Sequence, residues 1–184
     1  MSSELSNIVP DRRQAIVAAA LEAFSRFGYR RAVMADIAAA AGISRPLLYT
    51  VFPNKAAVFR ALAETLMADA IAAAEAAWPA DAPIAEGLAA AILAKDLPIQ
   101  RLLAATPHAA EILREAEALA GDLHHDTTAR FLALAGARLG DAGLARLVIN
   151  AADGVKHARL DEATYMADVR RLATMIAAGS DQPA

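Results

Sequence analysis

The sequence predicts an all-α protein with a small N-terminal domain and a larger C-terminal domain. Alanine supplies much of the 57% hydrophobic content, and glycine is scarce, with nine among 184 residues. That composition favours helix. Apolar residues recur at helical spacing in successive segments, and turn-forming residues separate these segments. A chain of this length can form one or two domains with packed cores.

Two short helices joined by a sharp turn are predicted within residues 34–55. The first spans about 34–41, and Gly42 can adopt the left-handed conformation that closes a helix C-terminus. The second spans about 45–51, and the hydroxyl of Ser44 can accept a free backbone N–H at its start. This arrangement is a helix-turn-helix, whose second helix enters a DNA major groove.

The second helix of this pair has an inner and an outer side. Pro46 falls in its first turn, where the missing N–H costs no intrahelical bond. Leu48 and Phe52 are expected to point inward as anchors. Arg45 and its neighbours remain around the rest of the surface, where they could meet DNA.

The stretch from Phe24 to Phe59 resembles the DNA-binding domain of the tetracycline-repressor (TetR) family. The similarity covers about residues 12–60, and many elements match in register. These elements are Phe24, Gly28-Tyr29, Asp36-Ile37-Ala38, Ala41-Gly42-Ile43-Ser44, Leu48-Tyr49, Phe52-Pro53-Asn54-Lys55 and Val58-Phe59. The resemblance implies a homodimeric transcriptional regulator, most often a repressor that a small molecule releases from a palindromic operator.

Individual DNA contacts follow from the helix surface and from the resemblance. Arg45 is the best candidate to read a base, because guanidinium can bond guanine O6 and N7 together, although a phosphate contact fits it equally well. Tyr49 and Lys55 match phosphate contacts of the family, and Thr50 could touch a phosphate or a thymine methyl. The expected DNA-binding residues are Ser44, Arg45, Pro46, Leu47, Tyr49, Thr50 and Lys55.

Two positions depart from the family pattern. The family usually has Ser or Thr just before the first motif helix, where Ala32, Val33 and Met34 stand here. It also favours His or Tyr two residues after the tyrosine, where Val51 stands here. Both positions often meet phosphates in the family. They motivate an alternative, a helical ligand-binding or interaction protein of the same fold that binds DNA weakly.

Charge divides the chain in a way that suits a DNA-binding head. Residues 1–60 hold eight Lys/Arg and four Asp/Glu, a net charge of +4, whereas residues 61–184 hold ten and seventeen, a net charge of −7. A basic head on an acidic body favours DNA contact through the head. Ordinary surface variation is the competing explanation.

We expect a DNA-binding domain over residues 1–53 and a ligand-binding and dimerisation domain over 54–184. The first helix should run from about 12 to 27, after a capping box that starts at Asp11. Asn54 should cap a long helix that ends near Ala77, and residues 79–83 should form a linker. Further helices are expected at about 84–95, 99–106, 109–120, 122–139, 142–159 and 161–178.

The last two helices carry narrow apolar stripes that suit helix-on-helix packing. Their position matches the place where the family builds its dimer. Each stripe could instead face the core of its own subunit. The expected dimer residues are Leu144, Val148, Ala151, Val155, Tyr165, Val169, Leu172 and Ile176.

An apolar effector pocket is the expectation for the body of the protein. Helices lined by alanine leave volume unfilled unless they close tightly, and apolar cavities take apolar ligands. Tight packing of these alanines is the alternative. The candidate lining residues are Leu66, Met67, Ala70, Ile71, Ala74, Leu102, Leu103, Ile112 and Phe131.

Other classes of function find little support in the sequence. There is no cysteine, so thiol chemistry is excluded. His124 and His125 are adjacent on a helix and would make a poor metal site. No nucleophile elbow or phosphate loop appears, so we expect neither an enzyme nor a cofactor. No membrane span or signal pattern is evident, which predicts a cytoplasmic protein.

Overall fold

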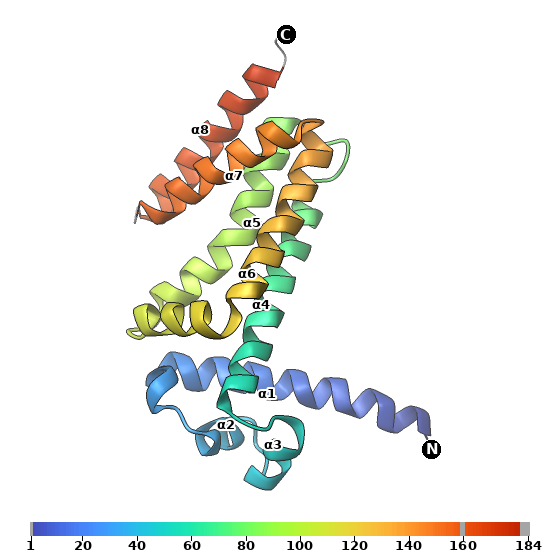
Figure 1. Ribbon diagram of the computed structural model, residues 1–184, viewed down its shortest axis with the longest axis vertical. Coiled ribbons are helices and arrows are strands. Elements are labelled where there is room, and N and C mark those ends of the chain that lie inside the picture. The colour runs from blue at the N-terminus through green and yellow to red at the C-terminus, as the bar shows by residue number, and fades with distance from the viewer. Residues whose placement is uncertain (1, 159–160, 181–184) are drawn as a thin grey trace. The chain divides into compact units, whose positions relative to one another are not determined.

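The computed structural model describes the backbone of residues 2–158 and 161–180, and the side chains of residues 12–158 and 161–179. Over these ranges the chain forms eight α-helices and no strand, which confirms the all-α prediction (Figure 1). The helices are α1 (Ser2–Arg31), α2 (Met34–Ala40), α3 (Arg45–Val51), α4 (Lys55–Ala77), α5 (Ile84–Ala104), α6 (Ala109–Leu139), α7 (Ala142–His157) and α8 (Glu162–Ser180). Within the described part of the chain, none of them is long and apolar enough to cross a membrane.

Helix α1 begins earlier than the sequence indicated and continues past the expected end. It starts at Ser2 rather than near residue 12, so the residues around Asp11 lie inside the helix. The helical dihedrals break at Gly28, with φ 75° and ψ 163°, before a last turn that reaches Arg31. That φ value strongly favours glycine, so the predicted stop at Gly28 appears as a sharp break within α1.

Helix α4 and the loop after it match the prediction closely. The Asn54 side chain accepts a hydrogen bond from the Ala57 backbone N–H at 2.9 Å, which is the expected N-cap. The helix ends at Ala77, and residues 79–83 form the predicted connection. Trp78 is buried just after the helix, and its carbonyl accepts a bond from Arg138 Nε at 3.0 Å.

Helices α5 and α6 correct the expectation of four shorter helices between residues 84 and 139. Proline at 98 lies inside α5 and does not end it, although an interior proline removes one backbone donor and crowds the carbonyl four residues earlier. The buried residues Leu93 and Leu97 hold the helix on the core just before it. In α6 the expected break near residue 121 is a kink at Ala120, with φ −145° and ψ 19°.

The last two helices have clear local start signals. The Asp141 carboxylate accepts bonds from the backbone N–H groups of Gly143 and Leu144, at 2.7 and 3.0 Å. Asp161 likewise accepts from the Thr164 backbone N–H at 2.9 Å. Helix α7 ends at His157, slightly before the predicted end, and α8 follows from Glu162.

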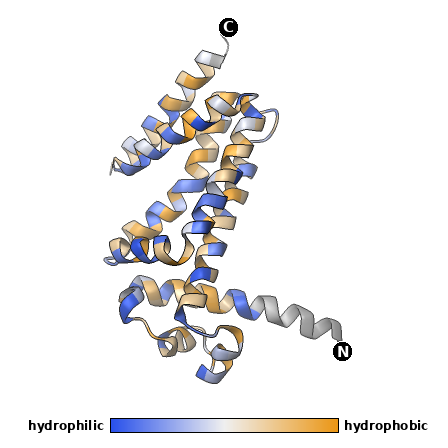
Figure 2. Cartoon of the chain, in the orientation of Figure 1, coloured by the Kyte–Doolittle hydropathy of each residue, from blue (hydrophilic) through white to orange (hydrophobic). Residues whose placement is uncertain are grey.

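The described residues pack into two compact units, each with its own apolar cluster. The head unit comprises those of Met1–Leu66 and Arg101–Leu123, and the body unit comprises those of Met67–Gln100 and His124–Ala184. Helices α4, α5 and α6 each contribute to both units, so the units of packing do not follow the expected functional division at residue 53. Figure 2 shows apolar and polar residues interleaved along these helices, as packed helices with one solvated side require.

The head cluster consists of buried residues from α1 to α4, with α6 side chains packed against it. Phe24 and Phe59 meet edge to face, with ring centroids 5.4 Å apart. The body cluster is richer in alanine and includes Trp78, Leu88, Ile92, Phe131, Val148 and Tyr165. Each unit therefore has a separate hydrophobic core.

Candidate nucleic-acid interface

The turn between α2 and α3 has the geometry that the sequence predicted. Gly42 has φ +64°, in the left-handed region. The Gly42 N–H donates to the Ala39 carbonyl at 3.1 Å, and the Ile43 N–H donates to the Ala38 carbonyl at 3.0 Å. This pair of bonds is a Schellman motif, which satisfies the carbonyls at the end of α2. The chain can therefore turn sharply into α3.

Helix α3 is anchored from its inner side. The Ser44 hydroxyl accepts a bond from the Leu47 N–H at 3.4 Å, which makes Ser44 the N-cap as predicted. Leu48 has no exposed surface, and Phe52, directly after the helix, is 2% exposed. These two apolar anchors fix the rotation of α3 about its own axis.

The opposite side of α3 faces solvent. Arg45 and Pro46 are exposed, Leu47 is half-buried, and Tyr49 keeps 47% of its surface accessible. Thr50 is also exposed, and its hydroxyl donates to the Leu47 carbonyl at 2.6 Å. The short helix therefore presents a guanidinium, a phenol and a methyl group together, which suits contact with phosphates and base edges.

Lys55 is used internally, which the sequence did not indicate. Its ammonium group donates to the carbonyls of Tyr29, Ala32 and Arg30, at 2.6, 2.9 and 3.3 Å. It also lies 4.4 Å from the centroid of the Tyr29 ring. The side chain thus satisfies carbonyls at the end of α1 and ties that end to the start of α4. Its phosphate contact stays a prediction.

The start of α2 lacks one half of a capping box. The Asp36 carboxylate accepts a bond from the Val33 N–H at 2.8 Å. The side chain of Val33 has no acceptor for the reciprocal bond, and 52% of its surface is exposed. Val51 is half-buried at the end of α3. Neither side chain can donate a hydrogen bond to a phosphate.

Residues 101–123 brace the head unit from outside the helix-turn-helix. The Glu111 carboxylate accepts a bond from the Arg30 N–H, and Glu115 lies 3.8 Å from the Arg30 guanidinium. The Thr106 hydroxyl donates to the Ser25 carbonyl at 2.7 Å. No sequence signal marked these contacts, because their partners are about 80 residues apart.

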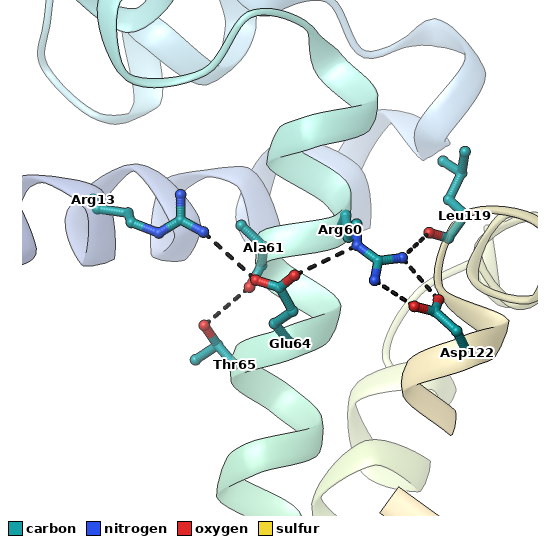
Figure 3. A network of polar contacts seen from close by, with 7 residues as sticks. All are labelled: Arg13, Arg60, Ala61, Glu64, Thr65, Leu119 and Asp122. Carbon is teal, nitrogen blue, oxygen red and sulfur yellow. Dashed lines mark hydrogen bonds and ion pairs between the residues drawn. The ribbon is translucent and has the colours of Figure 1, made fainter. Parts of the chain in front are cut away.

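An ion-pair network completes the brace (Figure 3). Arg60 on α4 donates to both carboxylate oxygens of Asp122 and to the Leu119 carbonyl, and Glu64 lies between Arg60 and Arg13. The hydrogen bonds from Arg60 lower the pKa of Asp122 to about 2. The pKa of Arg60 is raised in turn. These contacts hold α4 and α6 together within the head unit.

The structure distributes the predicted ligand-binding residues over both units. Leu66, Leu102, Leu103 and Ile112 belong to the head unit, and the other five belong to the body unit. In the body unit Ile71, Ala74 and Phe131 are buried in its cluster, Ala70 is buried, and Met67 is half-buried. These nine residues therefore come from both units, and their role in ligand binding stays a prediction.

The predicted dimer stripe turns largely toward its own core. Val148, Tyr165 and Val169 are at most 2% exposed and belong to the body cluster. Leu144, Val155, Leu172 and Ile176 are half-buried against that cluster, and only Ala151 is exposed. Packing within the subunit core thus explains why most of these eight residues are apolar. The large apolar side chains exposed on α7 and α8 are Leu147 and Met175, at 62% and 65%.

Within the described residues, no group of three or more His, Asp or Glu is placed to hold a metal ion. The rings of His124 and His125 are 6.4 Å apart and tilted.

An exposed short helix, anchored through a sharp glycine turn on a three-helix core, defines a helix-turn-helix domain of the DNA-binding class. Residues 16–62 match the family described as "Bacterial regulatory proteins, tetR family". The chain carries the TetR-family DNA-binding domain and has the fold of TetR-family transcriptional regulators, a class of regulators rather than enzymes.

Solved structures support the fold over almost the whole chain. A tetR-family regulator from Streptomyces coelicolor has a TM-score of 0.70 and 21% identity, over 92% of this chain and 80% of the other. A transcriptional regulator from a Rhodococcus species has a TM-score of 0.71 and 18% identity, over 94% and 99%. The multidrug-binding protein EbrR, solved with imidazole, has a TM-score of 0.64 and 21% identity, over 90% and 94%. A comparison with curated protein sequences finds no match.

Proposed function

We propose that the protein is a homodimeric transcriptional repressor that a small, largely apolar molecule releases from a palindromic operator. The observation that carries the DNA-binding part is the exposed side of α3, where Arg45, Tyr49 and Thr50 stand opposite the buried anchors Leu48 and Phe52. A dimer would place two such helices in successive major grooves, so the half-sites would lie about one helical turn apart. Such a repressor would act in the cytoplasm.

The body unit is the proposed effector domain. EbrR has a similar fold and is described as a multidrug-binding protein, which supports a ligand-binding role for this fold. A ligand that prefers the conformation unable to bind DNA would shift the population toward it and lower operator affinity. The functional boundary near residue 53 is part of this proposal.

The dimer contact is proposed on the exposed side of α7 and α8. Leu147, Ala151 and Gly154 are spaced by four and three residues on α7, and all three are exposed. Small residues beside one large apolar side chain allow close helix approach. This stripe is offset from the expected one, which lies against the core.

A gel-shift assay tests the DNA-binding role, with DNA flanking the protein's own gene at a stated salt concentration. Arg45→Ala is expected to weaken operator binding by about 1–3 kcal/mol and to relax specificity at one base pair. Arg114→Ala on α6 is the matched control, since it removes an exposed arginine outside the helix-turn-helix. Equal operator binding by the parent and Arg45→Ala would remove α3 from the interface.

The second candidate is a ligand-binding or interaction protein of the same fold that binds DNA weakly. Val33 and Val51 supply no phosphate donor, and the Lys55 ammonium is occupied by backbone carbonyls. The same assay distinguishes this candidate. Weak binding to every DNA, with no preferred sequence and a shallow salt dependence, would favour it.

A further inference from the structure

The body unit contains a polar cluster inside an otherwise apolar core. Asp96 on α5 is 4% exposed, and its carboxylate accepts bonds from Lys95 Nζ at 2.6 Å, the Tyr165 hydroxyl at 2.9 Å and Lys156 Nζ at 3.3 Å. Its partners come from α5, α7 and α8. Ile92, Leu97 and Val169 belong to the surrounding apolar cluster.

The two lysines of this cluster share one close carboxylate partner. Both ammonium groups pair with Asp96, and Asp153 on α7 adds a second negative charge that acts on Tyr165. Burial alone would raise the pKa of Asp96, but Lys95 and Lys156, with hydrogen bonds from Lys95 and Tyr165, outweigh burial and lower it. Asp96 is therefore ionised at neutral pH, and both lysines share its carboxylate.

The cluster also has more donors than acceptors. Gln100 follows Asp96 by one helical turn, and its Nε2 is buried without a hydrogen-bond partner in the described part of the chain. Gln100 lies close to the Tyr165 hydroxyl and lowers the pKa of that group, which burial and Asp96 raise strongly. A buried donor without a partner is costly, so an additional acceptor at this place would be favourable.

The same cluster is bordered by apolar and aromatic surface and is not sealed. Lys95 Nζ lies 5.1 Å from the centroid of the Phe131 ring. The side chains of Lys95 and Lys156 keep 16% and 27% of their surface accessible. The two lysine side chains are therefore partly open to solvent at the border of the apolar cluster.

We propose that Gln100, Lys95 and Lys156 bind the carboxylate of an amphipathic effector with one negative charge and an apolar chain or ring. The two ammonium groups, which share Asp96, supply the opposite charge, and Gln100 Nε2 supplies a donor that has no partner among the described residues. This inference rests on the proposed function, because it names the chemistry of the effector. It adds one anionic group to the apolar ligand that the sequence suggested.

Isothermal titration calorimetry on the full-length protein tests the inference. The probes are decanoate, 4-phenylbutyrate and 1-naphthoate, each compared with its primary amide. At least one carboxylate should bind about tenfold or more tightly than its amide, because a hydrogen bond to a charged group is stronger than a neutral one. Gln100→Leu and Lys156→Met should each weaken that binding about tenfold. Arg130→Met removes a positive charge elsewhere in the body and should leave it unchanged.

Other outcomes of these experiments would contradict the inference. If the cluster serves stability alone, Gln100→Leu will raise the thermal midpoint by removing an unpartnered donor and will not affect probe binding. Should Lys156→Met fail to fold, Gln100→Leu still decides, since it removes a buried Nε2 that has no partner among the described residues. No carboxylate binding at millimolar concentration, or equal binding of acids and amides, would overturn the inference.

The gel-shift assay separates this inference from the proposed function. Operator binding without carboxylate binding defeats the inference alone. Carboxylate binding without operator binding defeats the regulatory role alone.

Discussion

At the residue scale, Lys55 illustrates how a side chain that matches a DNA contact can have a structural task. Its ammonium group bonds carbonyls at the end of α1 and lies over the Tyr29 ring. Replacing it with methionine keeps the apolar stem and removes these bonds. We expect Lys55→Met to lower the free energy of unfolding by about 1–3 kcal/mol, measured by denaturant titration.

The same variant separates a structural role of Lys55 from a role in DNA binding. If Lys55 also contacts a phosphate, the salt dependence of binding will fall by about one unit, at conditions where the variant is folded. An unchanged salt dependence together with lower stability would assign Lys55 to the fold alone. Arg45→Ala should show the reverse pattern, with parental stability and weaker DNA binding.

Asp122 provides a pH-dependent measurement of the brace between α4 and α6. Its folded pKa of about 2 lies below the ordinary value of 3.8, so the folded state favours the charged carboxylate. The contribution to stability is therefore complete above about pH 5 and is lost as the pH falls toward 2.

The thermal midpoints of the parent and Asp122→Asn should differ by a constant amount from pH 5 to pH 7. The difference should close between about pH 4 and pH 2, as the parent carboxylate becomes protonated. Asp126→Asn, which changes an exposed carboxylate on the same helix, is the control. A difference in thermal midpoint that persists at pH 2 would mean that the charge of Asp122 does not cause it.

At the scale of elements, the sequence predicted the features that depend on neighbouring residues. The caps at Ser44 and Asn54 and the glycine turn at Gly42 all involve bonds that span a few residues. Helix continuation was harder to predict. The chain remains helical through Pro98 because burial of the preceding residues outweighs one lost backbone bond, and that burial depends on distant helices.

Gly87 in α5 tests how closely Trp78 packs on that helix. A Cβ at Gly87 would lie 2.0 Å from the Trp78 ring, which no real contact tolerates. Alanine normally gains about 1 kcal/mol over glycine within a helix, but overpacking costs about 1–3 kcal/mol. We expect Gly87→Ala to be destabilising overall and to shift the emission of Trp78, the only tryptophan, toward the red.

Gly136→Ala in α6 is the matched control for this substitution. Its added Cβ would lie 3.8 Å from Ala142 Cα, an ordinary contact. This variant should be neutral or slightly stabilising, with parental fluorescence. Equal effects of the two substitutions would show that Trp78 can move at little cost.

At the scale of the whole molecule, adjacent residues on α7 separate assembly from folding. Leu147 is 62% exposed and Val148 is fully buried. Leu147→Glu should therefore give folded monomers in sedimentation experiments, whereas Val148→Glu should unfold the body by burying an unpaired charge. A dimer of Leu147→Glu with parental affinity would place the contact away from this stripe.

Contacts between residues that are far apart in the sequence could not be predicted, for one physical reason. Apolar spacing marks a helix face but does not say whether that face meets its own core or a second subunit, so Val148 and Val169 looked like interface residues. Polar pairs such as Arg60 with Asp122 are 62 positions apart, and only the fold brings them together. The helix-turn-helix was predictable because its geometry and its family pattern are both local.

The brace by residues 101–123 also bears on how the protein could be recombined with its relatives. A chimera that joins residues 1–66 to another regulator's body would leave Arg60 without its carboxylate and Arg30 without its glutamates, and would expose the head cluster where Ile112 and Leu119 pack. The transplantable module is therefore discontinuous in sequence. An exchange of operator specificity that keeps the native stability would have to carry the start of α6 along with α1 to α3 and the start of α4.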